Sequence, residues 1–99
     1  MIVVRNVFRL KFGQAKPALA LWKEGRAMMK AANPKASPRL LTDLVGPSYT
    51  LVYEDSYQDL AAFEQAAHAV MGSDEWRAWY QKFLPLVDSG YREIFSIVE

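Results

Sequence analysis

The chain opens with the stretch Ile2-Val-Val-Arg-Asn-Val-Phe-Arg-Leu-Lys-Phe12, in which apolar and polar positions alternate. A period of two, rich in β-branched and aromatic side chains, predicts a β-strand with two distinct faces. Asn6 is the exception, because it falls in the middle of the more apolar face. A buried amide without a partner costs about 1–3 kcal/mol, so we expect Asn6 to contact either a protein group or a ligand.

The period becomes helical over residues 15–32, where Pro17 suits a first turn. One face of this helix carries the apolar stripe Ala18, Leu21, Trp22, Gly25, Met29 and Ala32. The proline-rich residues 33–38 predict a loop. Two strands are then expected over residues 39–45 and 49–54, joined as a hairpin at Gly46-Pro-Ser48.

A second helical region follows, with Asp55 or Ser56 as its expected capping residue. Gly72 interrupts it, and Ser73-Asp-Glu75 has the capping side chain and the two acids typical of a new helix start. Pro85 should end this helix. A last strand is expected over residues 91–98.

The resulting order, β-α-β-β-α-β with the second helix in two pieces, predicts an α+β, ferredoxin-like split β-α-β fold. Its antiparallel sheet would have helices on one face, and 99 residues suit a single domain spanning residues 1–99. The open face of the sheet also carries apolar side chains, among them Val3, Val7 and Phe95. We therefore expect a homodimer formed by sheet-on-sheet packing; the alternative is a monomer with scattered exposed apolar residues.

The composition excludes several kinds of site. The absence of cysteine excludes disulfides and thiolate metal sites, and a single histidine argues against a zinc site, so we expect no metal and no cofactor. A net charge of +1 and the lack of a long apolar run predict no nucleic-acid or membrane partner and a cytoplasmic protein. The charge is uneven, with nine basic and two acidic residues in 1–49 against three and nine in 50–99. These halves could match each other across a twofold interface.

The order of elements resembles the dimeric α+β barrel superfamily, in which two ferredoxin-like subunits pack sheet to sheet. Within it, the chain is similar to the NIPSNAP family in three runs: Tyr53-Glu-Asp-Ser-Tyr-Gln-Asp-Leu60, Gly72-Ser-Asp-Glu-Trp-Arg-Ala-Trp79 and Phe83-Leu-Pro-Leu86. The opening strand running into Phe12-Gly13 also resembles the first strand of that family. Where the family often has an arginine on this strand, the chain has Asn6.

Some haem-degrading members of the superfamily also place an asparagine on the first strand, with a tryptophan and a histidine on the second helical region. Here Tyr80 falls near the position of their histidine ligand, and His68 lies one helix piece earlier. This departure argues against haem.

Several side chains are candidates for a ligand site. Trp22, Trp76, Trp79 and Tyr80 could form the aromatic wall of a pocket, although aromatic stripes at helical spacing also build cores. Arg26 flanks the Trp22 stripe and could reach an anionic ligand or form a salt bridge. The ligand-binding candidates are therefore Asn6, Trp22, Arg26, Trp76, Trp79 and Tyr80.

His68 lies at the flank of its helix stripe, where a partly solvated histidine is expected. It is the only side chain expected to titrate near neutral pH, which makes it the candidate for acid–base catalysis. The catalytic candidates are therefore His68 and the polar Asn6 of the first strand. We interpret the chain as a protein that binds a small apolar or aromatic molecule in a cleft between helices and sheet. The alternatives are a cofactor-independent monooxygenase acting on an aromatic or polyphenolic substrate and a purely structural dimer.

Overall fold

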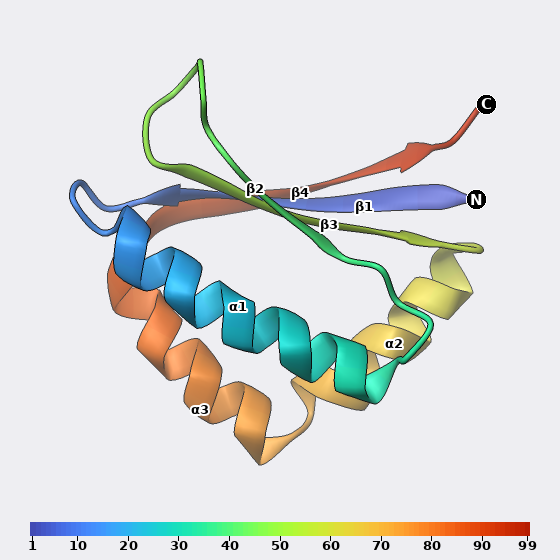
Figure 1. The fold of residues 1–99 in the computed structure, drawn as a ribbon. Coiled ribbons are helices and arrows are strands. Elements are labelled where there is room, and N and C mark those ends of the chain that lie inside the picture. The colour runs from blue at the N-terminus through green and yellow to red at the C-terminus, as the bar shows by residue number, and fades with distance from the viewer.

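The computed structural model describes residues 1–99 and contains one four-stranded sheet with all helices on one face (Figure 1). The elements are β1 (Ile2–Leu10), α1 (Ala15–Ala32), β2 (Arg39–Thr42), β3 (Thr50–Tyr57), α2 (Leu60–Met71), α3 (Asp74–Phe83), a short 3₁₀ helix η1 (Leu84–Leu86) and β4 (Val87–Ser96). The strands are antiparallel in the order β2-β3-β1-β4. This confirms the ferredoxin-like fold expected from the sequence.

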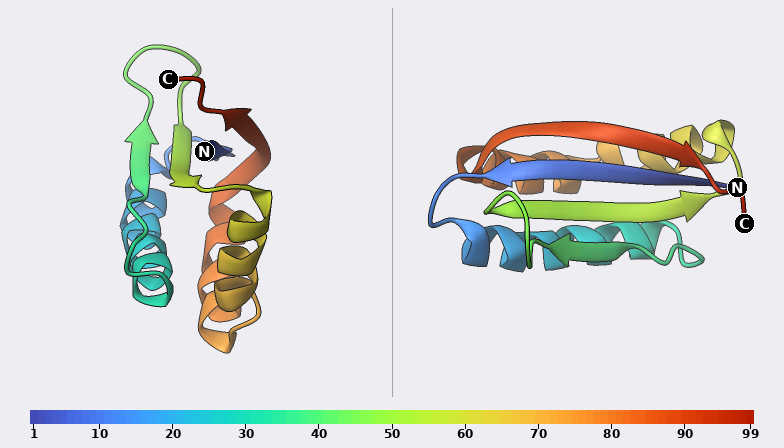
Figure 2. Two further views of the ribbon diagram at one scale, coloured as in Figure 1. Left: turned by 90° about the vertical axis from the view of Figure 1, so that its right-hand side faces the viewer. Right: turned by 90° about the horizontal axis from the view of Figure 1, so that it is seen from above.

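The helices divide the inner face of the sheet between them. Figure 2 shows α1 beneath the β2–β3 side, whereas α2 and α3 lie beneath the side that contains β4. Both chain ends lie at one end of the sheet, where the Ile97 N–H donates to the carbonyl of Met1 over 3.0 Å. None of the helices is both long and apolar enough to cross a bilayer.

Strand β1 is central and therefore fixes which side chains face the helices. It pairs with β3 and β4, with Asn6 opposite Tyr53 on one side and opposite Arg92 on the other. Residues that lie directly opposite each other in paired strands point to the same face of the sheet, so these three side chains share the inner face. The alternation expected for the first strand is confirmed, although the strand ends at Leu10 and not at Phe12.

The core is aromatic and is built around Trp22 of α1, which is 4 % exposed. Its ring centroid lies 4.6 Å from that of Trp79 and 4.9 Å from that of Tyr53. Edge-to-face and tilted contacts at such distances contribute about 0.5–1.5 kcal/mol each beyond the burial of apolar area. Trp22 therefore joins α1 to α3 and to the sheet.

Helices α1 and α3 approach closely at Gly25, which is buried on α1. A Cβ atom at this position would lie 2.8 Å from Cζ2 of Trp79. The indole ring of Trp79 therefore occupies the space that a side chain would need. Gly25 has ordinary helical backbone geometry, which any residue could adopt. A glycine is therefore required here by the close approach of Trp79 and not by the backbone conformation.

Two boundaries in the second half differ from the sequence expectation. Asp55 and Ser56 do not cap α2, because β3 continues to Tyr57 and both residues belong to it. The N-cap is Asp59, whose side chain accepts a hydrogen bond of 2.9 Å from the backbone N–H of Ala62. The Ser73 cap of α3 is confirmed, since its Oγ accepts from the N–H of Trp76 over 3.2 Å.

The last strand also begins earlier than expected, at Val87. The run Asp88-Ser-Gly90 has the composition of a turn, but Ser89 and Gly90 pair with β1, and the register shifts at Asp88. A Cβ at Gly90 would lie 2.8 Å from the ring of Phe8, so this glycine allows the aromatic ring to lie against the strand. Long-range packing has overridden the local turn preference.

The connection between β2 and β3 is longer than the hairpin expected at residues 46–48. Strand β2 ends at Thr42, and residues 43–49 extend beyond the sheet on the side away from the helices (Figure 1). Leu44 and Val45 on this loop are 96 % and 95 % exposed. The loop therefore presents two large apolar side chains to solvent.

Candidate functional site

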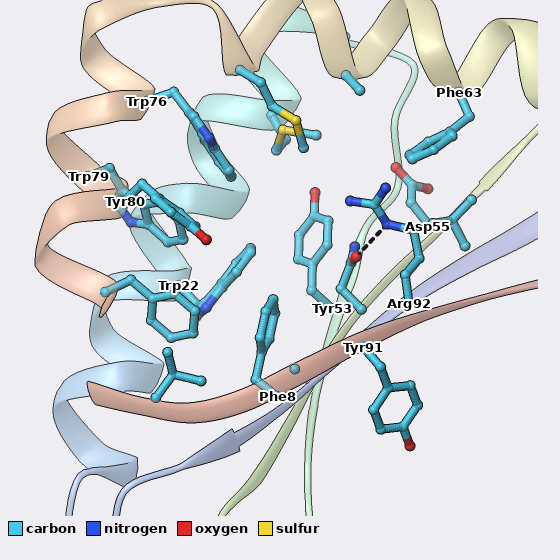
Figure 3. Close-up of a pocket in the computed structure, with 18 of the residues that line it drawn as sticks. Phe8, Trp22, Tyr53, Asp55, Phe63, Trp76, Trp79, Tyr80, Tyr91 and Arg92 are labelled. Carbon is cyan, nitrogen blue, oxygen red and sulfur yellow. Dashed lines mark hydrogen bonds between the residues drawn. The ribbon is translucent and has the colours of Figure 1, made fainter. Parts of the chain in front are cut away.

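A cavity of about 490 Å³ lies between the inner face of the sheet and the helices. Twenty residues line it, fifteen of them hydrophobic, and they come from all three helices and from β1, β3 and β4 (Figure 3). This volume falls within the range of about 300–1,000 Å³ that is usual for small-molecule pockets. The aromatic residues do not fill the space between helices and sheet.

One end of the cavity is aromatic. Trp76 and Trp79 are stacked with their centroids 4.7 Å apart, and Tyr80 lies nearly parallel to Trp76 at 6.5 Å. Figure 3 shows these rings on the α3 side, with Trp22 and Phe8 facing them. Tyr80 is exposed and Trp76 is half-buried, so solvent reaches this wall.

Two buried indoles of this wall differ in their hydrogen bonding. The Nε1–H of Trp79 donates to the backbone carbonyl of Leu21 over 2.7 Å. The Nε1 of Trp22 is buried and has no acceptor within hydrogen-bond distance. A buried donor of this kind costs about 1–3 kcal/mol when it stays unpaired. The N–H of Trp22 is thus a buried, unpaired donor in a residue that lines the pocket.

The opposite end of the cavity is polar and is built by the three long strands. Asn6 and Arg92 are direct cross-strand neighbours on β1 and β4, and the Arg92 Nε–H donates to Oδ1 of Asn6 over 2.8 Å. The guanidinium carbon of Arg92 also lies 5.1 Å from the centroid of the Phe63 ring, in cation–π geometry. These contacts hold the guanidinium at the cavity, as Figure 3 shows.

Strand β3 contributes Tyr53, Asp55 and Tyr57, which are two residues apart and therefore share the inner face. The Tyr53 hydroxyl is buried without a hydrogen-bond partner. Burial raises the pKa of Tyr57 to about 12 and raises the pKa of Tyr53 even further. Both hydroxyl groups are therefore protonated at neutral pH and are able to donate.

Asp55 is a buried carboxylate in the same lining, 7 % exposed. Burial raises its pKa, and this outweighs the hydrogen bonds from backbone N–H groups, including that of Ser56 at 2.8 Å, which lower it. A carboxylate that is desolvated in this way is disposed to take up a proton. It is the acidic side chain of the cavity.

The structure brings together five of the residues predicted to bind a ligand: Asn6, Trp22, Trp76, Trp79 and Tyr80 all line the cavity. Arg26 is exposed on α1 and lies outside the lining, although its charge is close enough to Tyr53 to oppose slightly the rise in the pKa of that phenol. His68 is also exposed, on α2, and lies outside the cavity lining. No group of three or more potential metal ligands is clustered anywhere in the protein.

The other residues of the polar end are not among those predicted from the sequence. Tyr53, Asp55 and Tyr57 alternate along one strand, which is a signal that could have identified them, but the expected helix cap at Asp55 ends the predicted strand at Glu54. Arg92 could be placed only by the register, which sets it directly opposite Asn6. Nothing in the local sequence distinguishes its side chain from an ordinary solvated arginine.

The outer face of the sheet carries a row of alternating charges. Arg39, Glu54, Arg5 and Glu93 are successive cross-strand neighbours on β2, β3, β1 and β4. Glu54 is buried and forms ion pairs with Arg39 and, at 3.0 Å, with Arg5. Apolar side chains lie on either side of this row, and the exposed ones among them include Leu41, Tyr91 and Phe95.

The structure of this chain is similar to several solved structures of other proteins. No family sequence model and no curated protein sequence matches the chain. An uncharacterized NIPSNAP domain protein from Burkholderia xenovorans superposes with a TM-score of 0.88 at 16% identity, covering 99% of this chain and 95% of that one. A NIPSNAP family protein from Agrobacterium tumefaciens also has a TM-score of 0.88, at 18% identity, covering 99% and 93%.

Oxygenases are also among the solved structures that superpose on this chain. SnoaB, a cofactor-independent oxygenase from Streptomyces nogalater, superposes with a TM-score of 0.73 at 15% identity, covering 99% of this chain and 93% of that one. Sequence identities this low establish the fold and leave function open. The chain has the ferredoxin-like fold of the NIPSNAP domain structures, as the order of its elements and its NIPSNAP-like motifs predicted. It shares this fold with antibiotic biosynthesis monooxygenase structures as well.

Proposed function

We propose that the protein binds a small apolar or aromatic molecule in the cavity beneath the sheet. The observation that carries this proposal is the open aromatic cavity of about 490 Å³, in which the Trp22 N–H and the Tyr53 hydroxyl have no protein partner. A core evolved only for stability would give these buried groups hydrogen-bond partners. A bound molecule can stack on Trp76 and Tyr80 and accept the free hydrogen bonds.

A cavity-filling variant tests this proposal. Ala67 is buried on α2 and lines the cavity, whereas Ala61 on the same helix is exposed. Two- and three-ring aromatic compounds should quench the tryptophan fluorescence of the wild-type protein and raise its melting temperature. Ala67→Phe should abolish both effects, and Ala61→Phe should retain them. Equal responses of all three proteins would place the ligand outside the cavity and contradict the proposal.

We propose further that the working unit is a homodimer formed by the outer face of the sheet. A twofold axis that lies between two facing sheets and runs along the strands reverses the order of the charge row. It then sets Arg39 against the partner's Glu93 and Glu54 against the partner's Arg5. The alternating row is therefore self-complementary, which suits a symmetric interface. The exposed Leu44 and Val45 extend on the same side and add apolar area.

A second candidate function is a cofactor-independent monooxygenase. It is favoured by the shared fold with SnoaB and by a desolvated carboxylate, Asp55, that faces the cavity as a proton acceptor. Without a cofactor, the substrate itself must reduce O₂. One oxygen atom enters the substrate as a carbonyl in place of two hydrogens, and the other oxygen leaves with those hydrogens as water.

This activity is tested by oxygen uptake with a panel of polyphenols. Turnover should fall at least tenfold in Asn6→Ala and in Asp55→Asn, which alter the polar end of the cavity. His68→Ala should retain full turnover, because His68 is exposed and lies outside the cavity lining. The absence of oxygen uptake across the panel would exclude this candidate and leave the binding function.

A further inference from the structure

The cavity is richer in unpaired hydrogen-bond donors than in acceptors. The buried Trp22 Nε1 and Tyr53 hydroxyl have no partner, and both side chains are 4 % exposed. Arg92 uses its Nε on Asn6, and none of the three ion pairs of the protein involves its terminal nitrogens. Oδ1 of Asn6 accepts the hydrogen bond from Arg92. The side-chain NH₂ group of Asn6 is a further donor at this end of the cavity, and it makes no hydrogen bond to another protein group.

The position of Arg92 is controlled from two sides. Asn6 binds its Nε, and the ring of Phe63 lies beside its guanidinium carbon at 5.1 Å. These contacts leave the two terminal nitrogens as a planar pair of donors, the geometry that matches the two oxygens of a carboxylate. Figure 3 shows the guanidinium directed into the cavity, on the side of the Tyr53 hydroxyl.

We propose that the ligand of this cavity is a planar aromatic monocarboxylate, with its carboxylate on Arg92 and Asn6 and its rings against Trp76 and Tyr80. This inference rests on the proposed binding function and specifies its ligand class. The aromatic and polar ends of the cavity are formed by different elements, α3 and the strands, so a molecule with one apolar and one anionic end matches both.

Asp55 is the one side chain of the cavity that would oppose an anion. Its burial raises its pKa, so the folded protein disfavours the negative charge on this side chain. A bound carboxylate would raise the pKa further, because a nearby like charge disfavours ionisation of Asp55. Uptake of a proton on ligand binding would turn Asp55 into a hydrogen-bond donor to a ligand oxygen, in common with the two tyrosine hydroxyls.

Two matched compounds separate this inference from the proposed function. 2-Naphthoate carries a carboxylate, and 2-acetylnaphthalene replaces it with a neutral group of similar shape. Calorimetric titration should show that the wild-type protein binds the naphthoate at least tenfold more tightly. Arg92→Met should remove this preference without weakening the binding of 2-acetylnaphthalene, whereas Arg77→Met, on the exposed face of α3, should leave the preference intact.

A second variant covers the case in which Arg92→Met does not fold. Asn6→Asp keeps the arginine but sets a carboxylate against it, so it should also abolish the preference for the naphthoate. In the NMR spectrum of indole N–H groups, naphthoate should shift the Trp22 signal more than that of Trp79, whose N–H is already bonded to Leu21.

The possible results are distinct. Equal affinity of the wild type for both compounds, or a preference that survives both variants, would overturn the anionic ligand class and leave the aromatic pocket standing. Failure of the wild type to bind either compound at millimolar concentration would overturn the ligand class and the proposed function together.

Discussion

Arg92 and Asn6 face each other across the β1–β4 pair, and the arginine Nε–H donates a 2.8 Å hydrogen bond to the asparagine Oδ1. The bond lies on the inner face of the sheet, at the polar end of the cavity. It resolves the question that the sequence raised about a polar residue within the apolar face of the first strand. Asn6 is paired, and its partner comes from the last strand of the fold.

This pair should contribute to stability as well as to binding. Hydrogen bonds that involve a charged group are worth about 1.5–3 kcal/mol when formed, and the exposed side of Arg92 lowers this value. We expect Asn6→Ala to reduce the free energy of unfolding by about 1 kcal/mol. A double-mutant cycle with Arg92→Met in urea denaturation should show a coupling energy of about 0.5 kcal/mol or more. Strict additivity of the two substitutions would show that the bond contributes nothing in solution.

The buried Asp55 should make stability depend on pH. Its pKa in the folded protein is raised above its ordinary value of 3.8, so the folded state binds the proton more tightly than the unfolded state. Stability from this group is therefore present at low pH and is lost as the pH rises through the raised pKa. Asp55→Asn should raise the melting temperature at pH 7, and this gain should vanish as the pH approaches 3.8.

The exposed Asp88→Asn serves as the control for this experiment, because the same charge is removed from the surface. It should leave the melting temperature unchanged across the pH range. If the Asp55→Asn variant is less stable than wild type at pH 7, the desolvated carboxylate is not the dominant effect at this site.

The close contact of α1 with α3 predicts opposite results for two glycines. At Gly25 an added Cβ would lie 2.8 Å from the Trp79 ring, whereas at Gly72 the nearest atom is the backbone oxygen of His68 at 3.6 Å. Overpacking costs about 1–3 kcal/mol, which exceeds the helix-propensity gain of about 1 kcal/mol for alanine. Gly25→Ala should therefore lower the free energy of unfolding by about 1 kcal/mol.

Gly72→Ala should be neutral or slightly stabilising in the same denaturation experiment. Equal effects of the two substitutions would mean that Trp79 can move away from α1 at no cost. Such a result would also weaken the assignment of Trp79 as a rigid part of the cavity wall.

The charge row on the outer face predicts which surface substitution would disrupt the proposed dimer. In the twofold arrangement, Glu93→Lys would set a lysine against the partner's Arg39. We expect this variant to raise the dimer dissociation constant at least tenfold in sedimentation experiments, since like charges at an interface are strongly unfavourable. Glu64→Lys, an equal charge change on the exposed face of α2, should leave the dimer intact. A wild-type protein that stays monomeric even at high concentration would contradict the proposed dimer.

Much of the fold could be predicted because its strands and helices produce short-range periodic patterns of apolar residues in the sequence. The alternation of the first strand, the helical stripe from Ala15 to Ala32 and the Ser73 cap all depend on neighbours a few residues apart. The wrong predictions concern element boundaries that depend on packing between residues far apart in the sequence. Asp88-Ser-Gly90 looks like a turn, yet it forms part of β4 because the ring of Phe8 lies against Gly90.

The aromatic half of the candidate site was predictable for the same reason. Trp76, Trp79 and Tyr80 recur at helical spacing, so their shared face follows from the sequence. Arg26 and His68 have the chemistry of binding residues, but both lie on exposed helix positions outside the cavity lining. A position at the flank of a helix stripe does not tell whether the side chain reaches the cavity or the solvent.

The order of elements, the ferredoxin-like fold and the aromatic character of the space between helices and sheet all follow from the amino-acid sequence. That this space is a cavity with a polar end follows only from how the elements pack together. Asn6 and Arg92 are 86 residues apart in the chain, and only the antiparallel register of β1 and β4 makes them neighbours. Whether a donor has a partner depends on every element around it, so the unpaired groups that suggest a ligand are a property of the whole fold.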